Sequence, residues 1–139
     1  MKKIAAVLIA VSMISFLGCN NAPKSEDDLK KGYMGTFAGV IPCADCEGIQ
    51  IVLELNPNNT VVEYSLYKGT NSGDNIISSA WEASGPDFSV IKIKKGVKGE
   101  YDYWQFISKD ELRKMDIKGK PITSDLNYSL KRVVRDQKI

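Results

Sequence analysis

The sequence predicts an all-β protein, a small antiparallel up-and-down barrel of about seven or eight short strands. Two observations support this prediction. From residue 32 onward apolar and polar residues alternate with a period of two, and turn-forming residues recur about every eight to twelve positions. An open sheet of roughly 100 residues would leave long edges exposed, so we expect the sheet to close. Consecutive hairpins favour a barrel, and a sandwich of two sheets is the alternative.

The strands are expected in chain order, each followed by a turn. The first begins at Gly32, and its glycines favour bending or close backbone approach. Residues 49–55 give the clearest alternation, and a turn at 56–59 leads to a returning strand at 61–67. Further strands are expected at 79–84, 88–94, 100–108, 111–117 and 126–133, with the longest loop at 69–78. Six aromatic residues are expected to line the interior: Tyr33, Phe37, Trp81, Phe88, Trp104 and Tyr128.

The N-terminal segment has the pattern of an export signal. Lysines at positions 2 and 3 precede an apolar run at 4–17, which is shorter than the roughly 20 residues of a membrane-spanning helix. Gly18 offers a small residue for cleavage, and the segment resembles a bacterial lipoprotein signal peptide, residues 1–18. This resemblance implies that acyl chains such as palmitate are attached to the sulfur of Cys19. An uncleaved anchor is the alternative, and either arrangement tethers the protein to a membrane.

Three further regions follow the signal. Residues 19–31 are polar and charged without apolar periodicity, which predicts a flexible tether between the lipid and the barrel. The barrel is expected over residues 32–134, and residues 135–139 form a C-terminal tail. Asn20, rather than an acidic residue, follows the lipid-bearing cysteine. By resemblance to proteobacterial sorting rules, this implies an anchor in the outer membrane.

The charge composition argues against nucleic acid as a partner. The chain has 19 basic and 17 acidic residues, and removal of Lys2 and Lys3 leaves 19 − 2 = 17 basic residues against the same 17 acidic ones. A protein that binds a polyanion needs a concentrated basic surface. The most basic run, residues 92–98, is interpreted as balanced by four acidic residues: Glu100, Asp102, Asp110 and Glu111. Electrostatic attraction to a charged membrane is therefore not expected either.

The most specific chemical feature is a pair of thiols, Cys43 and Cys46. Pro42 fixes the backbone just before the pair and Gly48 permits a sharp turn just after it, which predicts a tight loop between two strands. Export would place both thiols in an oxidising compartment. The chain contains no histidine, which removes the commonest metal ligand and the usual general base. We therefore expect a protein that is not an enzyme.

The two thiols have three interpretations. They form a structural disulfide, which would close so short a loop that it stabilises the fold by less than about 3 kcal/mol. Alternatively, they bind Cu(I) as soft ligands, with a thioether from Met34 or Met115 as an added donor. Thiol exchange is the third, although no helix N-terminus follows the pair, and Asp45 and Glu47 are expected to raise the thiol pKa.

The thiol loop also identifies a family that this sequence resembles, the NlpE N-terminal domain family of copper-resistance and envelope-stress lipoproteins. The resemblance rests on residues 39–49, which contain Cys43 and Cys46, and it is supported by the segments 112–116, 119–122 and 127–130. It implies a lipocalin-like barrel, anchored by lipid in the cell envelope, with a CxxC loop at one rim. Longer members carry a second, OB-like domain, for which the residues up to Ile139 leave no room, so functions of that domain are not expected here.

The resemblance and the residues together lead to a functional expectation with one alternative. We expect an envelope lipoprotein that senses or sequesters copper through Cys43 and Cys46, or reports the state of the envelope to a signalling protein. The alternative is a lipocalin-like carrier of a small apolar ligand, in which the two cysteines form a purely structural disulfide.

Overall fold

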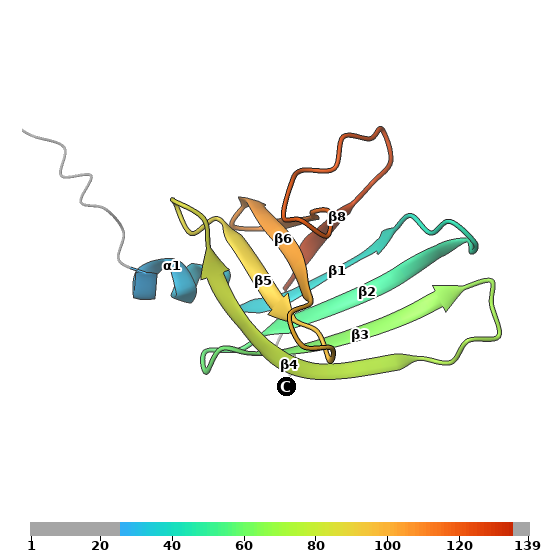
Figure 1. Ribbon diagram of the computed structural model, residues 1–139, viewed down its shortest axis with the longest axis horizontal. Helices are drawn as coiled ribbons and strands as arrows, with labels where there is room; N and C mark the ends of the chain where they lie inside the picture. The colour runs from blue at the N-terminus through green and yellow to red at the C-terminus, as the bar shows by residue number, and fades with distance from the viewer. Residues whose placement is uncertain (1–25, 135–139) are drawn as a thin grey trace, which may run out of the picture.

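Eight strands close into an antiparallel barrel, which confirms the predicted fold class (Figure 1). The computed structural model describes residues 26–134 of the 139-residue chain. Neighbouring strands follow the chain order around the barrel, and the last strand pairs with the first. The elements are α1 (Glu26–Tyr33), β1 (Gly35–Ile41), β2 (Gly48–Leu55), β3 (Thr60–Lys68), β4 (Asn75–Ser84), β5 (Val90–Lys94), β6 (Tyr101–Ser108), β7 (Glu111–Lys114) and β8 (Ser129–Val133).

Strand alternation directs one set of side chains into the interior. Phe37 of β1 lies opposite Leu53 of β2, and Ile91 of β5 lies opposite Trp104 of β6. Each of these four side chains is fully buried. They belong to a continuous apolar core that also contains Tyr33, Ile41, Ile51, Leu55, Val61, Trp81, Ile93, Phe106, Leu112 and Leu130. The alternation predicted for residues 49–55 is therefore confirmed, with its apolar members facing inward.

A short helix precedes the barrel, in a segment where the sequence shows no apolar periodicity. Helix α1 covers the later part of the expected tether and includes Tyr33, which was expected in the first strand. The Tyr33 ring stacks on Phe106 with 3.8 Å between the ring centroids. The guanidinium of Arg132 donates hydrogen bonds to the backbone oxygens of Gly32 (2.8 Å) and Met34 (2.6 Å) at the end of the helix. The helix is thus held by contacts with Phe106 and Arg132, which lie much later in the chain.

Several strand limits and two aromatic positions differ from the expectation. β4 begins at Asn75 instead of residue 79, because residues 75–80 pair with β3 along most of its length. β7 ends at Lys114 and β8 begins only at Ser129. Tyr128 is half-buried. Phe88 is also half-buried, because it lies in a turn with φ 55°, and neither ring belongs to the core.

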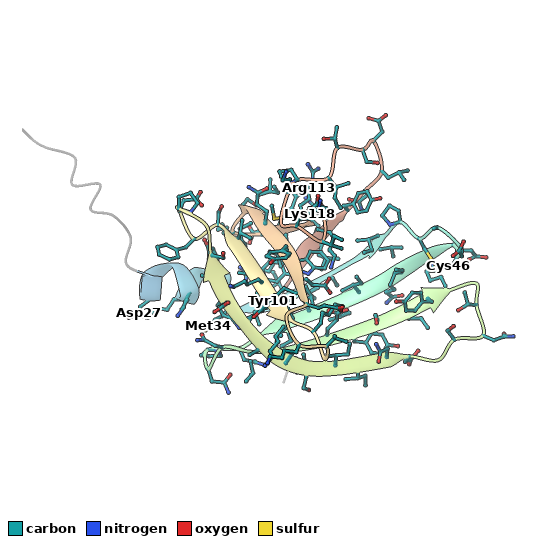
Figure 2. All side chains as sticks on the ribbon, viewed as in Figure 1. Asp27, Met34, Cys46, Tyr101, Arg113 and Lys118 are labelled. Carbon is teal, nitrogen blue, oxygen red and sulfur yellow. A yellow bond between two sulfur atoms is a disulfide. The ribbon has the colours of Figure 1, made fainter. Side chains whose placement is uncertain are left out.

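The barrel has two different ends. Helix α1 lies at one end, together with the turns that join β2 to β3 and β4 to β5 (Figure 1). The loop between β1 and β2, which carries the two cysteines, lies at the other end. Figure 2 shows this separation, with Asp27 and Met34 near α1 and Cys46 at the far end. Cys19 and the predicted signal, most of the predicted tether and the predicted tail at 135–139 lie outside the described residues.

Candidate functional site at the disulfide rim

Cys43 and Cys46 form a disulfide in the loop between β1 and β2. Their Cα atoms are 5.3 Å apart, within the usual range for a disulfide. Both residues are half-buried, whereas Ala44 and Asp45 between them are exposed. The structure therefore places both predicted site residues together on a rim loop, on neither a helix nor a buried strand.

Gly48 makes the exit from this loop sterically feasible. Its φ is 142°, and a Cβ atom at this position would lie 2.8 Å from Cγ1 of Val40. One residue before β2, the backbone N–H of Glu47 donates a hydrogen bond of 3.1 Å to Lys68 O. This bond extends the pairing of β2 with β3 into the loop. The predicted role of Gly48 is confirmed, and the loop is fixed on both sides by strand pairing.

A surface cavity of about 350 Å³ borders the disulfide. Its lining is mostly apolar and comprises Val40, Ile41, Pro42, Cys43, Cys46, Glu47, Leu126 and Asn127. Asn127 closes one side, since its Nδ2 lies 3.5 Å from Val40 O while its Oδ1 accepts the N–H of Ser129 at 3.1 Å. Leu126, expected in the last strand, is instead 60% exposed beside the cysteines. The sequence pattern did not identify Leu126 or Asn127 as neighbours of the thiol loop.

The surroundings of the sulfur atoms give them little electrostatic activation. Glu47 is the only ionisable side chain that lines the cavity. Sγ of Cys46 lies 3.4 Å from Gly48 O. A disulfide sulfur carries no proton, so this contact becomes a hydrogen bond only after reduction. Neither a basic side chain nor a helix N-terminus is found among the residues that line the cavity, so this loop lacks the features that activate a catalytic thiol.

The sequence suggested copper as a metal for the two thiols, and the reduced pair offers ligands that suit Cu(I). No group of three or more His, Cys, Asp or Glu side chains among residues 26–134 is arranged to hold a metal ion. Two thiolates can serve Cu(I), which prefers soft sulfur ligands. Met34 lies at the α1 end of the barrel, so it is not a third ligand, and Met115 is buried at 5% exposure. Of the sulfur ligands considered, the structure brings Cys43 and Cys46 together.

A second group of chemically distinctive side chains lies on the inner face, and the sequence pattern did not indicate it. Asp102 accepts from both Lys114 (Nζ to Oδ1 2.7 Å) and Lys95 (Nζ to Oδ2 2.5 Å). The Lys114 ammonium also lies 4.7 Å from the centre of the Trp104 ring. Glu63 on β3 faces the same interior, between Leu53 and Ile77 on the flanking strands.

Burial shifts the protonation equilibria of this group. Desolvation raises the pKa of Glu63 above its ordinary value, and the nearby Lys95 only partly offsets this. Desolvation lowers the pKa of Lys114 despite its contact with Asp102. Burial alone would raise the pKa of Asp102, but the ammonium groups of Lys114 and Lys95 hold it below its ordinary value. We name Glu63, Lys95, Asp102 and Lys114 the inner charge cluster.

The fold and the site place this protein in one structural class, the closed eight-stranded antiparallel barrels with a disulfide loop at one rim. The family model of the NlpE N-terminal domain matches residues 37–125. Lipoprotein NlpE of Escherichia coli (strain K12) is 33% identical over 138 residues, which cover 93% of this chain and 56% of that protein. The chain therefore belongs to the NlpE N-terminal domain family, and it spans just over half the length of the E. coli relative.

Solved structures agree with the assignment. A crystal structure of a Shewanella oneidensis protein is similar at a TM-score of 0.62 and 28% identity, over 72% of this chain and 88% of that chain. The crystal structure of the Cpx pathway activator NlpE from Escherichia coli is similar at a TM-score of 0.54 and 29% identity, over 73% of this chain and 52% of that chain. Among residues 26–134, no helix is both long and apolar enough to span a membrane.

Proposed function

We propose that this protein is a lipid-anchored lipoprotein of the cell envelope that responds to copper and to thiol redox conditions through Cys43 and Cys46. The observation that carries the proposal is the disulfide on an accessible rim loop, at the opposite end of the barrel from α1. The lipid anchor is assigned to Cys19, which precedes α1. Membership of a family that includes E. coli lipoprotein NlpE supports the anchor and the envelope location.

The chemistry of the response has two states. In the oxidised state the sulfur atoms are bonded to each other and have no thiolate to offer a metal. An external dithiol that supplies two electrons and two protons would convert the bond to two thiols and itself become a disulfide. Cu(I) then binds both sulfurs and releases the two protons. Because each thiol must lose its proton when copper binds, copper binding should weaken as the pH falls.

Signalling and localisation form the second part of the proposal. The E. coli relative of known structure is described as an activator of the Cpx pathway, which supports an envelope signalling protein as the partner of this chain. The outer membrane is proposed from Asn20 after the lipidated cysteine. Cys43 and Cys46 line the mostly apolar cavity, so reduction of their bond would act directly on a surface that such a partner could contact.

The alternative of a carrier for an apolar ligand finds less support in the interior. The apolar core extends from Phe37, Trp81 and Leu112 to Ile41 and Ile51 near the disulfide loop. An apolar ligand would also have to desolvate the inner charge cluster without compensation. We therefore do not extend the proposal to a lipid carrier.

The test is competition for Cu(I) between the reduced protein and a chromophoric chelator. The full chain should remove one equivalent of Cu(I), while a Cys43→Ser, Cys46→Ser double variant and the oxidised protein should remove none. Equal uptake by the reduced protein and the double variant would contradict the copper proposal. Counting free thiols on protein isolated from its native envelope, with and without added copper, tests the redox proposal, which would fail if the thiol count never changed.

A further inference from the structure

Polar and charged side chains enter the barrel interior beside the apolar core. β3 and β6 direct Glu63, Ser65 and Asp102 inward, and β7 adds Lys114 opposite Trp104. Small barrels normally fill their interior with apolar side chains. Taking charged groups out of water costs several kcal/mol per ion before pairing, and here Asp102 and Lys114 are mostly buried while Lys95 keeps 34% of its side-chain surface exposed. Such a cluster therefore suggests a function other than holding the barrel together.

Hydrogen-bond donors and acceptors in this region remain partly unused. The Glu63 carboxylate has no hydrogen-bond partner among the described residues, although the charges of Lys95 and Lys114 act on it. Nε1 of Trp104 is sealed from solvent without an acceptor, in a side chain of 0% exposure. The ammonium groups of Lys95 and Lys114 each carry three N–H donors and contact Asp102.

These free groups fall into two chemical kinds. Glu63 offers oxygen atoms to a positively charged donor. Lys95, Lys114 and Trp104 offer N–H groups to a negatively charged acceptor. With two carboxylates and two ammonium groups ionised, the inner charge cluster has no net charge, which matches a ligand that is neutral overall but carries separated charges.

We propose that the inner charge cluster binds a small zwitterion, such as a free amino acid or a short peptide. The ligand ammonium pairs with Glu63, and the ligand carboxylate accepts from Lys95 and Lys114. This site is distinct from the disulfide and does not depend on its redox state. It also differs from an apolar carrier site, because recognition is electrostatic.

Access from solvent is available beside the cluster. Lys95 and Asp102 also line a rim cavity of about 360 Å³, together with Gly99, Glu100, Tyr101, Tyr103 and Ile117. This volume falls within the roughly 300–1,000 Å³ typical of small-molecule sites. Glu63 and Lys114 do not line this cavity, so a ligand that enters through it contacts the Lys95 to Asp102 ion pair first.

A matched set of three small molecules tests the charge requirement. Alanine carries both charges at pH 7, alaninamide carries only the positive charge, and N-acetylalanine carries only the negative one. Isothermal titration of the full chain should show one alanine bound per chain, at least tenfold more tightly than either of the others. The proposal is overturned if alanine shows no saturable binding up to about 10 mM, or if all three bind equally.

Variants then assign the two ends of the ligand. Glu63→Gln should weaken alanine binding about 10- to 100-fold, as expected for loss of one charge-assisted hydrogen bond, and leave N-acetylalanine no weaker. Lys114→Met should weaken both alanine and N-acetylalanine. Glu82→Gln is the matched control, because Glu82 pairs with Lys92 outside the cluster, and it should change nothing. Equal affinities for alanine in the Glu63→Gln variant and the parent protein would refute the assignment.

Two controls separate this site from the proposed copper response. The Cys43→Ser, Cys46→Ser variant should bind alanine as the parent protein does, so a failed copper titration leaves this proposal standing. Circular dichroism and thermal unfolding should show that each variant is folded. If Lys114→Met does not fold, the comparison of three ligands in the parent protein and in Glu63→Gln still decides the outcome.

Discussion

Nη1 of Arg132 donates a hydrogen bond of 2.6 Å to the backbone oxygen of Met34, a residue 98 positions earlier in the chain. The same guanidinium also donates to Gly32 and Lys109, and its Cζ lies 4.5 Å from the centre of the Phe37 ring. Arg132 therefore joins the end of α1, the β6 to β7 turn and β1. One side chain from the last strand thus ties together three segments at the end of the barrel nearer α1.

Replacing this side chain should loosen the closed end. Arg132→Met keeps an apolar stem over Phe37 but leaves three backbone oxygens without their donor, so we expect a loss of about 2–4 kcal/mol in the free energy of unfolding. Urea denaturation measures this loss, and hydrogen exchange of α1 amides should accelerate more than that of β2. Lys131→Met is the control, since Lys131 is 70% exposed in a surface ion pair and should cost less than about 1 kcal/mol.

The turn after the disulfide should require glycine. In Gly48→Ala the new Cβ meets Val40 at 2.8 Å in a backbone conformation that other residues rarely adopt, and we expect a cost of about 1–3 kcal/mol. Gly73→Ala is the matched control because a Cβ there meets nothing within 4 Å. Chemical denaturation of both variants compares them directly. Equal midpoints would show that the rim loop relaxes freely around residue 48.

The disulfide should contribute little to the stability of the barrel. Cys43 and Cys46 are three positions apart, so chain entropy predicts that their bond stabilises the fold by about 2 kcal/mol. The Cys43→Ser, Cys46→Ser variant should therefore remain folded with a modest decrease in its urea midpoint. Adding a reductant should lower the midpoint of the parent protein and leave that of the variant unchanged. A loss above about 4 kcal/mol would mean that the bond is an integral part of the fold, contrary to a role in sensing.

Stability should depend on pH through Glu63. Because burial raises the pKa of Glu63 in the folded protein above its ordinary value of 4.5, the folded state holds the proton more tightly than the unfolded state. This contribution to stability is fully present below pH 4.5 and is lost as the pH rises through the folded pKa. Glu63→Gln should therefore gain stability relative to the parent protein at neutral pH, and the gain should shrink as the pH falls. Thermal unfolding from about pH 4 to about pH 8 tests this, and a gain that does not shrink toward pH 4 would contradict it.

Local alternation was enough to predict the barrel, because each strand contains its own pattern of inward and outward residues. Residues 49–55 show this well, with Ile51, Leu53 and Leu55 buried. β3 shows where the pattern becomes ambiguous, since both of its faces contain apolar residues. The inward set includes Val61, Glu63 and Ser65, and the charged member would ordinarily be assigned to solvent.

Contacts between distant parts of the chain explain the remaining differences. Helix α1 depends on Arg132 and on the stacking of Tyr33 against Phe106, neither of which leaves a signal in residues 26–33. The acidic residues assigned to balance the run at 92–98 do so only in part. Asp102 pairs with Lys95 of that run, whereas Asp110 pairs with Lys109 and Arg132, and Glu111 pairs with Lys131. The sequence could identify the cysteine pair but not the side chains that surround it.

Pairing between β1 and β8 is limited to three residue pairs, at Thr36, Ala38 and the residue between them, and it joins the first strand to the last. The chain is synthesised from its N-terminus, so the barrel cannot close until the final strand is available. Cys43 and Cys46 need no such long-range partner to meet. The oxidation state of this pair can therefore be set by the surroundings while the rest of the molecule is still assembling, and it can differ between newly made and mature copies of the same chain.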